Sequence, residues 1–151
     1  MKILTAPEEK QIISPSLFLA GGISNCGDWQ GEMIDLLADT GLTLINPRRE
    51  SFDTDDLTVT EAQIAWEYRR LRQASAVLFW FPPETLCPIT LFELGGALER
   101  GAPVFVGCHP AYARREDVRV QVALCRPEVS TAFSLATLSE QVKAWHALAA
   151  H

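Results

Sequence analysis

The sequence has no apolar run approaching the roughly 20 residues that a membrane-spanning helix requires. Its first ten residues contain no long apolar segment either, so no signal peptide is predicted and we expect a cytoplasmic protein. Basic residues are few, since 13 Lys and Arg stand against 19 Asp and Glu, for a net charge of -6. Because nucleic-acid grooves depend on clustered Lys and Arg, we expect neither a nucleic acid nor a membrane as a partner.

Cysteines are also few, and they are widely spaced. The four of them, Cys26, Cys87, Cys108 and Cys125, form no C-x-x-C pair, so a metal or redox motif is unsupported and reduced thiols are expected. No serine stands in a nucleophile-elbow pattern, and residues 21–24 do not complete the dinucleotide fingerprint. Hydrolysis by a serine triad and hydride transfer are therefore disfavoured, and no cofactor is predicted.

Apolar runs alternate with helical patterns along the 151 residues, which we expect to form one domain over residues 1–151. Strands are predicted at 16–20, 42–45, 76–81 and 103–106, with weaker candidates at 1–4 and 129–133. Helices are predicted at 29–40, 61–73, 90–101, 115–124 and 138–149. This alternation predicts an α/β fold of three layers, in which helices cover both faces of a five-stranded, mostly parallel sheet. Right-handed crossovers would bring the loops after the first three of the stronger strands to one edge, where such folds bind ligands.

One carboxylate, Glu93, is predicted in the first turn of the helix that follows the most apolar strand. Two glycines, Gly95 and Gly96, come directly after it, and glycine inside a helix often marks a close approach to the backbone. Residues 90–93 also match a capping box, in which the Glu side chain only caps the helix. A reactive and a capping role for Glu93 are both open at this point.

A second carboxylate, Glu67, lies beside the apolar positions Ile64 and Leu71 on the preceding predicted helix. It is either an edge residue paired with the nearby Arg69 or Arg70, or a desolvated acid whose raised pKa holds a proton near neutral pH. Glycoside chemistry requires two carboxylates in different environments, one ionised and one protonated.

Other polar and aromatic residues are weaker candidates. Arg48 and Arg49 are suited to a phosphate or carboxylate, although solvated loop arginines are the usual case. The acidic residues at 53, 55 and 56 match no metal-binding loop, and His109 follows a strand, so it could reach the site. Five aromatic residues could stack on a planar base or simply fill the core: Trp29, Trp66, Trp80, Phe52 and Phe81.

Five segments occur in an order typical of one protein family: 17–24 with Trp29, 45–49, 66–67, 92–95, and 106–112 with 117–118. Over about residues 16–125 the chain resembles the nucleoside 2-deoxyribosyltransferase-like family. The resemblance implies a flavodoxin-like (Rossmann-like) fold and cleavage of the N-glycosidic bond of a (deoxy)nucleoside or nucleotide. It implies that Glu93 is the nucleophile and that Glu67, at a similar spacing, helps to protonate the departing base. The sugar would then pass to another base or to water.

The resemblance also implies a binding site and a homo-oligomer in which neighbouring subunits complete the site. Family members often carry an Asp in the loop before the nucleophile, whereas this chain has Cys87 there. A non-catalytic nucleotide-binding or sensor domain on the same fold is the alternative. The residues expected to bind substrate are Gly21, Gly22, Ser24, Trp29, Asn46, Pro47, Arg48, Phe52, Trp80 and Cys87, and no metal is expected.

Overall fold

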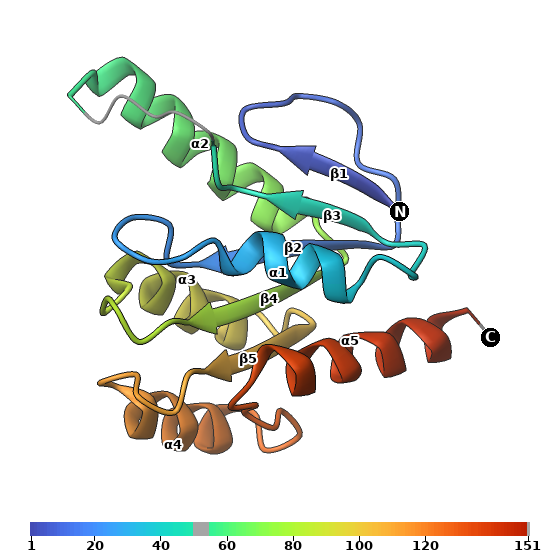
Figure 1. Ribbon diagram of the computed structural model, residues 1–151, viewed down its shortest axis with the longest axis vertical. Helices are drawn as coiled ribbons and strands as arrows, with labels where there is room; N and C mark the ends of the chain where they lie inside the picture. The colour runs from blue at the N-terminus through green and yellow to red at the C-terminus, as the bar shows by residue number, and fades with distance from the viewer. Residues whose placement is uncertain (50–54, 151) are drawn as a thin grey trace.

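A computed structural model describes residues 1–49 and 55–150. Five parallel strands form one sheet in the order β1-β3-β2-β4-β5 (Figure 1). Their bounds are Lys2–Thr5 (β1), Ser16–Gly21 (β2), Thr43–Asn46 (β3), Ala76–Phe81 (β4) and Val104–Cys108 (β5). The predicted α/β class with a five-stranded parallel sheet is confirmed, including the weak candidate at the N-terminus, which forms the edge strand beside β3.

Five helices cover the two faces of the sheet in the described part of the chain. They are Trp29–Leu36 (α1), Leu57–Gln73 (α2), Pro88–Glu99 (α3), Arg115–Cys125 (α4) and Leu135–Ala149 (α5). One core cluster joins α2, α3 and α4 to the sheet, and a second joins α1 and α5 to it. The two faces are therefore covered by different helices, as the three-layer prediction requires (Figure 1).

The alternation of side chains along β4 explains why both faces carry a core. Phe79 and Phe81 belong to the cluster under α2, α3 and α4, whereas Leu78 and Trp80 belong to the cluster under α1 and α5. Successive strand residues point to opposite faces, so a continuous apolar run is what a doubly covered strand needs.

The predicted strand at 129–133 is wrong, because only Ala132 pairs with the sheet, through an isolated parallel bridge to Gly107. Its amide donates to the Val106 carbonyl and its carbonyl accepts from the Cys108 amide, both at 2.9 Å. Ser134 then caps α5 through the Thr137 amide, so the chain turns into a helix before a strand can extend.

Several helix boundaries also differ from the prediction, among them the start of α5 at Leu135 rather than at residue 138. α1 is shorter, because the amides of Ala38 and Thr40 bond to carbonyls three residues back and the helix ends in turns. α2 begins earlier, because Asp56 accepts from the Thr58 and Val59 amides as its N-cap. None of the helices in the described ranges is long and apolar enough to cross a membrane.

The strands β3, β2 and β4 are neighbours in the sheet and run in the same direction. Their carboxyl ends are Asn46, Gly21 and Phe81, so the three loops that follow them meet at one edge of the sheet. The predicted convergence of these loops is confirmed, and it positions the candidate site.

Candidate active site

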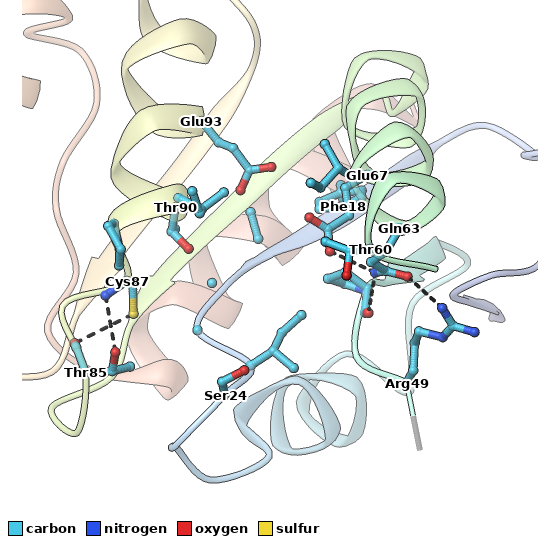
Figure 2. Close-up of a pocket in the computed structure, with 18 residues that line it drawn as sticks. Phe18, Ser24, Arg49, Thr60, Gln63, Glu67, Thr85, Cys87, Thr90 and Glu93 are labelled. Carbon is cyan, nitrogen blue, oxygen red and sulfur yellow. Dashed lines mark hydrogen bonds between the residues drawn. The ribbon is translucent and has the colours of Figure 1, made fainter. Parts of the chain in front are cut away.

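A pocket of about 350 Å³ lies at this edge, on the face covered by α2 and α3 (Figure 2). Its walls come from the end of β2 and the glycine loop, the turn after β3, α2, and the start of α3. The volume lies within the range of small-molecule sites. Seven of the predicted site residues line it: Gly21, Gly22, Ser24, Pro47, Glu67, Cys87 and Glu93.

Glu93 reaches the pocket from the second turn of α3. The helix begins at Pro88 rather than at Thr90, and its N-cap is Cys87, whose φ of 51° and ψ of 57° are left-handed. Proline suits the first helical position because its missing amide hydrogen would have no partner there. Thr90 is thus a buried residue of the first turn, and the predicted capping box is wrong. The half-buried Glu93 side chain is left to face the pocket.

Glu67 reaches the same pocket from α2, and neither of the predicted arginine partners pairs with it. Arg69 donates from Nη2 to Glu9 Oε1 at 2.6 Å. Arg70 donates to the carbonyl oxygens of Glu8 and Lys10, both at 2.9 Å. The surface salt-bridge interpretation of Glu67 is therefore wrong, since both arginines hold the segment after β1.

The two carboxylates point into the pocket from facing helices (Figure 2). Burial, followed by the negative charge of Glu67, raises the pKa of Glu93 to about 7, although Arg72 opposes the shift. Burial also raises the pKa of Glu67, while a hydrogen bond from Gln63 Nε2 to its Oε1, 2.8 Å long, lowers it. Both acids are therefore harder to ionise than ordinary carboxyl groups, and the charge of Glu67 adds to the cost of ionising Glu93.

The glycine loop after β2 packs closely against β4 and the start of α3, because Gly21 and Gly22 lack a side chain. A Cβ at Gly21 would lie 2.5 Å from the Trp80 carbonyl oxygen, and one at Gly22 would lie 2.9 Å from Cys87 Sγ. The Trp29 indole donates from Nε1 to the Gly22 carbonyl at 2.9 Å. Trp29 therefore supports this loop from behind the pocket wall.

The other pair of glycines behaves differently. A Cβ at Gly95 would meet nothing within 4 Å, and one at Gly96 would come within 3.2 Å only of the Arg100 guanidinium. The described residues therefore contain no close approach to α3 that would require Gly95 or Gly96. Both are exposed on the helix.

Several other predicted site residues lie behind or away from the pocket wall. Trp80 packs on the face of α1 and α5, and Asn46 is buried, its Oδ1 accepting from the Arg48 amide at 3.0 Å. Arg48 donates to the Gly27 carbonyl at 2.8 Å and to Gln30 Oε1 at 2.9 Å, so it braces the glycine loop against α1. Phe52 lies outside the described residues.

The remaining candidates do not line the pocket, and those within the described residues have contacts elsewhere in the fold. Trp66 is buried and donates to the Glu8 carbonyl at 2.8 Å, and Phe81 packs against Tyr112 with ring centroids 5.0 Å apart. His109 lines a hollow on the opposite face of the sheet. Asp53 lies outside the described residues, and among those within residues 1–49 and 55–150 no group of three potential ligands could hold a metal.

The loop before α3 is held by a contact from the segment after β5. The Tyr112 hydroxyl donates to the Leu86 carbonyl at 2.7 Å, next to the left-handed Cys87. Burial raises the pKa of the Cys87 thiol to about 11, so a neutral thiol lines the pocket at neutral pH. This is the neighbourhood in which the resemblance leads one to expect an Asp.

Sequence reasoning missed most of the uncharged polar residues in the wall. Gln63 and Thr60 lie on α2, and Thr85 and Thr90 lie near the start of α3. Gln63 stands four residues before Glu67, a spacing that places two side chains on the same face of a helix and would have predicted their contact. The apolar part of the wall consists of Phe18, Ala20, Ile23, Ile64, Pro88 and Ile89.

The five-stranded parallel sheet with helices on both faces is consistent with a flavodoxin-like fold, and the pocket with its two facing carboxylates lies at the carboxyl edge, where such folds bind ligands. The family described as nucleoside 2-deoxyribosyltransferase like matches residues 14–112, well over half of the chain, and the chain belongs to this family. The resemblance predicted from the sequence is thereby confirmed. The matched segment includes both carboxylates and extends to Tyr112, which anchors the loop before α3. A comparison with curated proteins found no match.

Proposed function

We propose that this protein cleaves the N-glycosidic bond of a (deoxy)nucleoside or nucleotide through a covalent glycosyl ester on Glu93. The observation that carries the proposal is the pair of half-buried carboxylates that point into one pocket from α2 and α3. Membership of the nucleoside 2-deoxyribosyltransferase-like family supports a nucleoside as the substrate class.

The reaction has two displacements. In the first, ionised Glu93 attacks the anomeric carbon, the bond from that carbon to the base nitrogen breaks, and the base leaves with the electron pair and takes a proton from Glu67. In the second, the nitrogen of another base, or water, attacks the same carbon, and its proton returns to Glu67 as the ester breaks. Covalent catalysis of this kind replaces one difficult step by two easier ones and retains the anomeric configuration.

Apart from Arg49, whose guanidinium is suited to a phosphate, the rest of the wall is uncharged and offers both polar and apolar contacts. Phe18, Ile64 and Ile89 offer apolar contacts for a base, and Ser24 and Thr90 offer hydroxyls for a sugar. Since Cys87 carries a neutral thiol, the expected Asp contact to the sugar is replaced by uncharged groups.

The proposal is tested with a panel of nucleosides, deoxynucleosides and their monophosphates, incubated with the protein with and without a second base. Chromatography that detects free base alone identifies a hydrolase, and an exchanged nucleoside identifies a transferase. We expect one of these two products. Binding by calorimetry without either product would contradict the proposal and identify a non-catalytic nucleotide-binding domain.

We also propose that the protein forms a homo-oligomer that covers the mouth of the pocket. Apolar side chains are exposed around it: Phe92 is 81% exposed, Ile89 65% and Ile64 61%, and the last two also line the pocket. By contrast, Val142 in the C-terminal helix is buried on the chain's own sheet. Exposed apolar clusters at a site rim are typical of protein interfaces.

Light scattering tests this arrangement. We expect the wild type to be at least dimeric and Phe92→Asp to be monomeric, because a charge at the centre of an apolar interface is strongly unfavourable. Leu124→Asp is the matched control, since Leu124 is 78% exposed on α4, a helix that contributes no residue to the pocket, whereas Phe92 lies on α3, which does. A monomeric wild type, or an equal effect of both substitutions, would argue against a rim interface.

A further inference from the structure

The side-chain amide of Gln63 is held on three sides. Its Nε2 donates to Glu67 Oε1 at 2.8 Å and to the Pro47 carbonyl at 3.2 Å, while its Oε1 accepts from Arg49 Nη1 at 3.4 Å. A guanidinium only donates and a carbonyl only accepts, so these contacts fix which end of the amide faces Glu67. Gln63 is also 8% exposed, which leaves it little freedom to rotate.

The turn after β3 provides the two fixed partners of this amide. Asn46 Oδ1 accepts from the Arg48 amide at 3.0 Å, which closes the turn around Pro47. The Pro47 carbonyl and the Arg49 guanidinium then contact the two ends of the Gln63 amide. Asn46 itself is buried and does not line the pocket, so its connection to the carboxylates passes through the turn and Gln63.

We propose that Gln63 is a positioning residue for Glu67, and that the turn at residues 46–49 acts on the carboxylate pair through Gln63. The catalytic meaning of this inference rests on the proposed function. The hydrogen bonds that support it are independent of that function. The Nε2 hydrogen bond holds one oxygen of Glu67 and favours its ionised form.

The charges around Glu67 come from three elements. Glu93 on α3 raises the cost of ionising both acids together, Arg49 lies in the turn after β3, and Arg72 on α2 favours the ionised form of Glu93. Cys87 contributes a neutral thiol at the start of α3, and the pocket residues of β2 have no ionisable side chains. Within this surrounding, Gln63 donates directly to Glu67.

The first test measures the Glu67 carboxyl directly, by a ¹³C nuclear magnetic resonance titration whose signal is assigned by its loss in Glu67→Gln. In Gln63→Met, which keeps a similar size but has no donor, we expect the pKa of Glu67 to rise by about one pH unit. In Gln63→Glu we expect a larger rise, because a negative charge replaces the donor. Gln121→Met makes the same change at an exposed position on α4 and should leave this pKa unchanged.

The second test follows the pH profile of kcat/KM. Gln63→Met should move the alkaline limb to higher pH by a similar amount and lower kcat about tenfold, because Glu67 loses its orientation. An unchanged pKa of Glu67 in the variants, or an equal loss of activity at every pH, would overturn the proposal and leave Gln63 a packing residue. A shifted pKa in a protein without turnover on any nucleoside would support the positioning role and refute the proposed reaction instead.

Discussion

Replacing Glu93 by Gln is expected to lower kcat/KM for base release by at least about 10³-fold, because an amide oxygen cannot form the glycosyl ester. The substitution keeps the size of the side chain and leaves the pocket walls unchanged, so substrate binding should persist. Glu99→Gln on the exposed surface of the same helix is the matched control and should retain full activity. Chromatographic rates of base release, with calorimetry of substrate binding, measure both effects.

The opposite carboxylate provides the comparison that separates the two roles. Glu67→Gln should slow substrates with poor leaving bases most, by about 10²–10⁴-fold, because those bases depend on general-acid protonation. Good leaving groups should be affected less. Base release by Glu93→Gln at the wild-type rate would show that Glu93 is not the nucleophile, and an equal loss for all bases in Glu67→Gln would argue against its role as the acid.

The main strands of this fold could be predicted because a strand that is buried on both faces consists almost entirely of apolar residues. β2 and β4 lie within the inner part of the sheet, with helices on both faces, and each is a nearly continuous apolar run. The segment at 129–133 is less apolar, since it includes Ser130 and Thr131, and it has one bridge to the sheet, at Ala132. Whether this segment forms a strand depends on the short connection to α5 and on the Ser134 cap. The pattern of apolar residues alone does not predict either of these.

The start of α3 shows a different limit of sequence reasoning. Residues 90–93 fit a capping box, and Pro88 fits a first helical position equally well. The choice depends on the left-handed backbone at Cys87, which is unusual for a residue other than glycine. The Tyr112 hydroxyl holds the neighbouring Leu86 carbonyl from a distant part of the chain, so a tertiary contact decides where this helix begins.

The two carboxylates of the candidate site could be predicted from the sequence, whereas most of the residues around them could not. Family resemblance identified Glu93 and Glu67, but the local sequence offered Arg69 and Arg70 as partners for Glu67. Those arginines instead bind the segment after β1, which is about 60 residues away along the chain. Strand alternation also separates Trp80 from the pocket, because it points to the opposite face from Phe79 and Phe81. The local sequence therefore did not predict the long-range contacts of the arginines or the face of the sheet to which Trp80 points.

The raised pKa of Glu93 predicts that this carboxylate destabilises the fold at neutral and alkaline pH. Its pKa is about 7 in the folded state and 4.5 as the ordinary value, so the folded state binds more protons between these pH values. Its contribution to stability is therefore lost as the pH rises from 4.5 to 7. Above pH 7 the cost reaches about 3 kcal/mol, because one pKa unit corresponds to about 1.4 kcal/mol.

Glu93→Gln should accordingly be more stable than the wild type at pH 8, by up to about 3 kcal/mol in the free energy of unfolding. Chemical denaturation at a series of pH values measures this difference, which should shrink through the range from 7 to 4.5 and vanish near pH 4. Glu99→Gln, at an exposed position of the same helix, should show no such pH dependence. A stability difference that stays constant from pH 4 to pH 8 would mean that burial in the pocket does not raise the pKa of Glu93. The expected combination, a more stable protein that has lost its activity, is what a buried charge kept for chemistry rather than for folding produces.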